Sequence, residues 1–147
     1  MFRQPLLVGI LVGICAVAGV GCGDSAPSAE TDRQQQAALT RYDAYLKENT
    51  AELARRVDTL RRKIDAEALS GSEGAYVYAR IPLGHIGPAA QLLQPLAKRV
   101  DGLEEETLPR DFGGFHAIEK WVYWELETLL MKPVVKRLQV DVADLRK

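Results

Sequence analysis

The chain has 147 residues, with 19 Lys and Arg against 20 Asp and Glu, so its net charge at pH 7 is −1. Because basic and acidic residues alternate along the chain, no basic stripe of the kind that binds nucleic acid is present. The length suits one small domain with a modest core, and the absence of internal repeats and of strand-like alternation favours an all-α fold.

The N-terminus has the order of a secretory signal peptide. A short segment carrying Arg3 is followed by an uncharged apolar run from Leu6 to Val20 and then by Gly21-Cys22. This run is shorter than the ~20 residues of a transmembrane helix. The junction resembles a bacterial lipobox, with Gly19 where Leu is usual, so we predict that Cys22 carries a lipid; ordinary cleavage nearby, giving a soluble secreted protein, is the alternative.

The two cysteines support the lipid interpretation. Cys15 lies inside the apolar run and would leave with the signal peptide, so only Cys22 would remain and no internal disulfide could form. We therefore predict a lipoprotein-type signal peptide over residues 1–21, a flexible polar tether over 22–32 and a helical domain over 33–147.

The segment Arg33–Leu69 is predicted to form the first helix. Thr31 with Gln34 fits a capping box, and Gly71 is expected to end the helix in the left-handed conformation. A heptad-like apolar seam runs along it through Leu39, Leu46, Leu53, Val57, Leu60 and Ile64. Such a seam needs partner helices.

The segment Ser72–Gly102 is predicted to be a second, less regular helical region that Ser72 caps. Its prolines, Pro82, Pro88 and Pro95, are expected to kink or break it. The apolar surface is expected to come from Ala75, Val77, Ile81, Leu92, Leu93, Leu96 and Val100. Residues 101–113 then read as a loop that contains three consecutive glutamates.

The segment Gly114–Thr128 is predicted to form a helix whose apolar arc holds Phe115, Ile118, Val122, Leu126 and Leu129. His116 and Glu119 lie at the margin of this arc. A last helix is expected to have Pro133 in its first turn, with Val135, Leu138, Val142 and Leu145 facing inward.

His116 and Glu119 are the strongest indication of chemistry in the chain. Residues spaced i and i+3 share one helix face, so an imidazole nitrogen and a carboxylate oxygen can converge on one metal ion. Two ligands bind weakly, so further donors are needed; the candidates are His85, Asp101, Glu104, Glu105, Glu106, Asp111 and Tyr123. A hydrogen-bonded pair at the start of a helix, beside solvated surface carboxylates, is the alternative.

Enzymatic activity is not expected. The HExxH pattern of metallopeptidases is absent, no Ser or Cys nucleophile stands beside a recognisable base, and no Gly-rich phosphate loop is present. Peptidase activity in particular would need a second metal-binding histidine on the same helix.

The segments Phe112–Trp121 and Met131–Val142 resemble the imelysin-like family, and within it the EfeO/EfeM type of periplasmic iron-uptake protein. The family's Gly-Phe-His-x-Ile-Glu-Lys motif matches Gly114–Lys120, and its Tyr-x-x-Ala-Arg helix and Ile-Asp-Gly turn resemble Ala75–Arg80 and Arg99–Gly102. The resemblance covers residues 42–147 and only the front half of the family. Gly87 replaces the glutamate of the family's Ile-Glu-Pro.

This resemblance implies an antiparallel up-and-down bundle of three to four helices that binds iron, Fe²⁺ or Fe³⁺, through His116 and Glu119 and delivers it to a membrane permease. A mixed nitrogen and oxygen site also admits Zn, Cu or Ca. The expected location is the cell envelope, facing the periplasm or the extracellular side. An incomplete bundle implies a homodimer or a second-bundle partner, and a helical lipoprotein with a purely structural or interaction role is the alternative.

Overall fold

The computed structural model describes residues 29–146 of the chain. Within them it contains five α-helices and no strand. The helices are α1 (Ala29–Asp65), α2 (Leu69–Ala90), α3 (Gln94–Asp101), α4 (Gly114–Lys120) and α5 (Thr128–Asp144). A 3-10 turn, η1 (Glu104–Glu106), precedes α4, and a π-helical turn, η2 (Trp121–Glu125), follows it.

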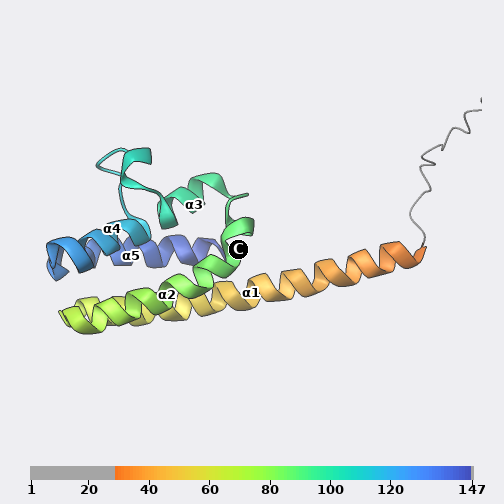
Figure 1. Cartoon of the computed structure of the whole chain (residues 1–147), viewed down its shortest axis with the longest axis horizontal. Coiled ribbons are helices and arrows are strands. Elements are labelled where there is room, and N and C mark those ends of the chain that lie inside the picture. The colour runs from red at the N-terminus through yellow and green to blue at the C-terminus, as the bar shows by residue number, and fades with distance from the viewer. Residues whose placement is uncertain (1–28, 147) are drawn as a thin grey trace, which may run out of the picture.

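The long helices alternate in direction. In Figure 1, α1 and α2 run antiparallel, α4 returns beside α2, and α5 runs back toward the C-terminus, while α3 packs against α4 and α5. The prediction of an all-α helical bundle is confirmed, but residues 29–146 form five helices where three to four were predicted.

The core forms where the C-terminal half of α1 meets α2, α4 and α5. Four residues of the predicted seam, Leu53, Val57, Leu60 and Ile64, have no exposed surface. Burying a side chain of this size stabilises a fold by about 1.5–3 kcal/mol, so these positions fix α1 in the bundle.

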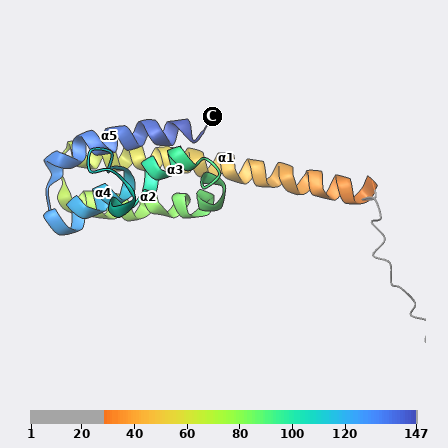
Figure 2. The same cartoon turned by 90° about the horizontal axis from the view of Figure 1, so that it is seen from above.

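The N-terminal half of the seam behaves differently. Leu39 is 61% exposed, so the expectation that it faces other helices is wrong. Figures 1 and 2 show this half of α1 projecting beyond the other helices. We call residues 29–44 the projecting arm. The arm begins at Ala29, so the last residues of the predicted tether, 29–32, are helical.

The connection between α1 and α2 corrects two predictions. Gly71 does not end α1, because α1 ends at Asp65 and the left-handed residue is Glu67, with φ 55°. The amide of Ala68 donates to Lys63 O and that of Glu67 to Ile64 O, which is a Schellman motif. Ser72 is not a helix cap either: it is buried inside α2, and its Oγ donates to Ala68 O.

The helix α2 continues through Pro82 and Pro88, so no break occurs at these two prolines. The break predicted at Pro95 is present, because α2 ends at Ala90 and Pro95 lies in the first turn of α3. Because the helix is continuous, a single face of it packs against the core along its whole length. The buried positions on it are Ser72, Tyr76, Ala79, Pro82, Leu83, Ile86 and Ala90. Of the predicted apolar surface, Val77 and Ile81 lie off the buried face of α2, and Leu92 and Leu93 lie in the turn after it, so all four are exposed.

The predicted helix 114–128 ends early. The turn η2 places an extra residue in the helical repeat, and Leu126 adopts the left-handed conformation with φ 54°. Phe115, Ile118 and Val122 are buried as predicted, whereas Leu126 and Leu129, beyond the π turn, are exposed.

The helix α5 begins at Thr128, where the carboxylate of Glu127 accepts from the amide of Leu129. Pro133 therefore lies beyond the first turn, contrary to the prediction. Val135, Leu138 and Val142 are buried as expected, and Leu145 is half-buried.

No helix within residues 29–146 has the length and apolar character needed to cross a bilayer. The predicted signal peptide, the lipidation at Cys22 and the tether up to residue 28 lie outside the described residues.

Candidate functional site

The start of α4 is held close to the end of α3. Gly114 has a φ of +70°, and a Cβ placed there would lie 2.3 Å from Val100 O and 2.6 Å from Arg99 O. Only glycine fits this approach, because any larger residue meets both the backbone of α3 and an unfavourable φ. The contact brings His116, in the first turn of α4, beside Asp101 at the end of α3.

His116 is oriented by Asp101. Its Nδ1 lies 3.1 Å from the carbonyl oxygen of Asp101 and 3.3 Å from the carboxylate Oδ1 of the same residue. Both partners are acceptors, so Nδ1 carries a proton, and in the neutral ring Nε2 keeps its lone pair. Metal-binding histidines typically have this arrangement, in which one ring nitrogen donates to an oxygen and the other binds the ion.

The Asp101 carboxylate is itself occupied. Oδ1 accepts from the guanidinium of Arg80, which also lies over the ring of Phe115, with 5.6 Å between Cζ and the ring centroid. Burial raises the pKa of Asp101, while the charges of Arg80 and His116 oppose that change. Asp101 therefore supports His116 from behind and is not a free ligand in this arrangement.

Glu119 is half-buried, beside two tyrosines. Burial raises the pKa of Tyr76, the charge of Arg80 opposes that change, and the nearby Glu119 carboxylate raises the pKa further. Tyr123 packs edge-on against Tyr76, with ring centroids 5.8 Å apart, and its hydroxyl donates to Glu73 O at 3.4 Å. Tyr123 thus lies near Glu119, while its hydroxyl is directed to another oxygen.

The predicted residues meet at an open depression between α4 and the 3-10 turn. We call it the acidic depression; it is lined by Leu103, Glu104, Glu105, Phe112, His116, Glu119, Lys120 and Trp124. Four of the predicted ligands, His116, Glu119, Glu104 and Glu105, are therefore gathered on one surface. Glu104 is bound by Lys120, whose Nζ lies 2.9 and 3.1 Å from its two carboxylate oxygens.

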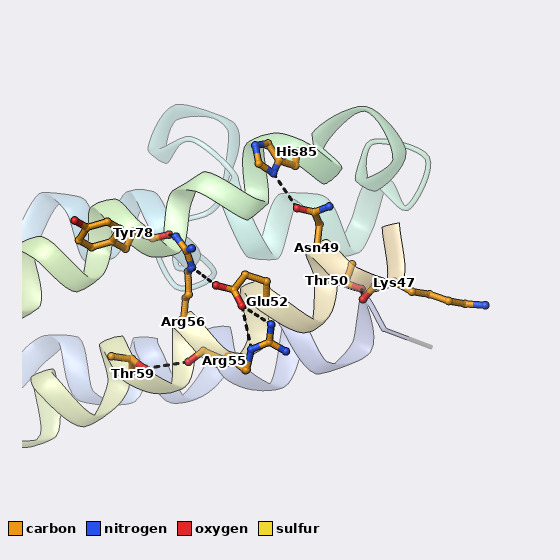
Figure 3. A network of polar contacts seen from close by, with 9 residues as sticks. All are labelled: Lys47, Asn49, Thr50, Glu52, Arg55, Arg56, Thr59, Tyr78 and His85. Atoms are coloured by element: carbon orange, nitrogen blue, oxygen red, sulfur yellow. Dashed lines mark hydrogen bonds and ion pairs between the residues drawn. The ribbon is translucent and has the colours of Figure 1, made fainter. Parts of the chain in front are cut away.

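Three other predicted ligands, His85, Glu106 and Asp111, lie elsewhere. His85 lies on α2, where its Nδ1 is 2.8 Å from Asn49 Oδ1 of α1, as Figure 3 shows. In the same view Glu52 is held by Arg55 and Arg56, so the surroundings of His85 belong to the packing of α1 on α2. Asp111 and Glu106 line a separate depression together with Lys98, Arg99 and Arg137.

The arrangement offers one oriented imidazole and several carboxylates of which some are already paired. Among residues 29–146 no group of three or more His, Cys, Asp or Glu side chains is poised to hold a metal ion. Binding a cation strongly here would therefore require the glutamates to turn toward the His116 Nε2, with water completing the coordination.

The sequence did not indicate the roles of Tyr76, Arg80 and Lys120. Tyr76 and Arg80 are one turn apart on α2 and reach the site only because α2 packs beside α4. The one signal available in the sequence was the positive charge of Lys120, which follows Glu119 in the chain and is opposite in sign to the predicted run of glutamates.

The chain resembles curated iron-uptake proteins. It is 29% identical over 114 residues to the iron uptake system component EfeO of Escherichia coli (strain K12), and this match covers 75% of the chain but 30% of the relative. The protein of the same name from Shigella flexneri matches to the same extent. No family model matches the chain.

The comparison supports a distant homology to EfeO. The chain spans about a third of the length of the curated relatives it matches. Membership of the imelysin-like family stays a prediction.

Proposed function

We propose that this chain is an envelope-anchored component of an iron-uptake system, which captures iron at the acidic depression and delivers it to a membrane permease. The observation that carries the proposal is the orientation of His116, whose Nδ1 faces two oxygens of Asp101 and leaves Nε2 for a cation. The distant homology to an iron-uptake component supports iron as the cargo.

In this proposal His116 supplies the nitrogen ligand, and Glu119 and Glu104 supply oxygen ligands. Carboxylates are hard donors that suit Fe³⁺, while imidazole suits Fe²⁺, so the mixed set accepts both and does not exclude Zn²⁺, Cu²⁺ or Ca²⁺. The open depression leaves room for water or for a chelator's oxygens, and transfer to a permease requires such accessibility.

The remaining features of the proposal concern location and partners. A lipid on Cys22 anchors the chain, the projecting arm holds the bundle away from the membrane, and the protein belongs to the imelysin-like family without being a peptidase. We also propose that a second copy of the chain or a partner bundle packs against this domain.

Titration of the protein with iron tests the site. Trp124 lines the acidic depression, so its fluorescence is expected to be quenched when Fe²⁺ is added anaerobically or Fe³⁺ is added as a citrate complex. His116→Ala and Glu119→Gln should each weaken binding by about tenfold or more, because each removes one ligand from a small set. Calorimetry on the same variants checks the affinity independently of fluorescence.

The matched control is His85→Ala, which removes the other histidine of the chain from the α1–α2 interface. Its affinity for iron should equal that of the wild type. If all three variants bind iron as the wild type does, the site assignment is wrong. Absence of iron binding in every form favours the alternative function, a helical lipoprotein with a structural or interaction role.

A further inference from the structure

We infer that Lys120 is a resident counterion of the acidic depression, which holds Glu104 away from the cation site and must be displaced when iron binds. The inference rests on the proposed function, since it concerns how the same site accepts its cargo. It assigns Lys120 a regulatory role, in which the side chain lowers the affinity of the acidic depression for iron so that the iron can be released.

The contacts of Lys120 connect three consecutive elements. Its Nζ lies 2.9 and 3.1 Å from the two carboxylate oxygens of Glu104, on the 3-10 turn, and 3.8 Å from Glu125 Oε1, on the π turn. The ammonium thus binds both oxygens of Glu104 and has a second carboxylate within reach.

Lys120 lines the same depression as His116 and Glu119. A metal ion bound by these two side chains would therefore lie near an ammonium group, and like charges at such range repel. The same ammonium binds Glu104, which is another carboxylate of the depression. Both effects lower the affinity for a cation, and both end when Lys120 moves.

Glu125 gives the displaced ammonium a place to go. Because its carboxylate already lies 3.8 Å from Nζ, a change of side-chain rotamer is enough to transfer Lys120 from Glu104 to Glu125. Glu104 is then free to turn toward the ion. Capture becomes an exchange of one cation for another, and release follows when the ammonium returns.

The test compares two variants with one control. Lys120→Gln and Lys120→Leu remove the charge, and both should bind Fe²⁺ about tenfold more tightly than the wild type, in titrations of the purified full chain followed by calorimetry. Lys132→Gln is the control, because Lys132 makes a comparable pair with Glu67, at 2.7 Å, between α5 and the α1–α2 turn. It changes the net charge equally and should leave the affinity unchanged.

Glu104→Gln completes the cycle. In the wild type this change should weaken iron binding only slightly, because the lost ligand is offset by an ion pair that no longer has to be broken. In the Lys120→Leu background it should cancel most of the gain in affinity. Circular dichroism confirms that each variant is folded.

The outcomes separate this inference from the proposed function. If both Lys120 variants bind iron with an affinity equal to or weaker than that of the wild type, the role of Lys120 is overturned and iron capture by the wild type still holds. A gain that Lys132→Gln reproduces also overturns it, because net charge alone would explain the result. If neither the wild type nor the Lys120 variants bind iron, both are overturned; binding that appears only in the Lys120 variants supports the inference.

Discussion

Two glycines of this chain face opposite requirements. Gly114 has a left-handed backbone and lies against the carbonyl groups of α3, whereas Gly74 lies inside α2 with nothing within 4 Å of the position that a Cβ would take. The first is needed for the contact that positions His116, and the second only weakens its helix.

Alanine substitutions at these two positions should therefore have opposite signs. We expect Gly114→Ala to lower the free energy of unfolding by about 2 kcal/mol or more, through backbone strain and the displacement of α4 from α3. Gly74→Ala should raise it by about 0.5–1 kcal/mol, because alanine favours the helix. Urea unfolding followed by circular dichroism measures both; a loss at Gly74 or no loss at Gly114 would contradict the packing described here.

At the scale of single residues, the sequence predicts those site residues that lie close to one another along the chain. His116 and Glu119 could be found because the helical repeat places them on one face, and Glu104 and Glu105 because they are consecutive. Arg80 and Tyr76 could not, since their approach to Asp101 and Glu119 depends on how α2 packs against α4. His85 was a reasonable ligand by residue type, but its partner is Asn49 on a different helix.

At the scale of elements, the helical content was predictable and the phase of some helices was not. The seam of α1 predicted Leu53, Val57, Leu60 and Ile64 correctly, because one continuous repeat specifies one face. In α2 the prolines suggested breaks that the packed helix does not have, so the predicted face was wrong. From Trp121 on, a π turn shifts the helical repeat of apolar residues, and no pattern in the sequence predicts such a turn.

The projecting arm gives a prediction about local stability. Its exposed Leu39 and Tyr42 gain little from tertiary packing, and a helix without such packing is marginal in water. Hydrogen exchange should therefore show weak protection of amides in residues 33–44 and protection close to the global value in residues 53–64.

The same measurement distinguishes a free arm from a covered one. Amides of Leu138 and Val142 in α5 provide the reference for full protection within the bundle. Equal protection along the whole of α1, increasing with protein concentration, would contradict a free arm and show that a second copy covers it.

At the scale of the whole molecule, one ion pair connects parts that are distant in sequence. Arg99 of α3 donates from Nε to Asp141 Oδ1 of α5 at 2.7 Å, and the Asp141 side chain is only 7% exposed. The other oxygen of this carboxylate, Oδ2, is buried without a hydrogen-bond partner. The pair holds α3, and with it Asp101 and the start of α4, on the surface of α5.

Removing one partner of this pair should cost more than removing both. Arg99→Met leaves a buried carboxylate without its cation, so we expect a loss of about 1–3 kcal/mol in the free energy of unfolding. Arg99→Met combined with Asp141→Leu removes the charge as well and should recover most of that loss, because apolar side chains of similar size fill the same space. Urea denaturation of the wild type, both single variants and the double variant measures the coupling. If the double variant is as unstable as the sum of the single ones, the two side chains act independently, and the attachment of α3 to α5 depends on apolar contacts such as that of Val100 instead.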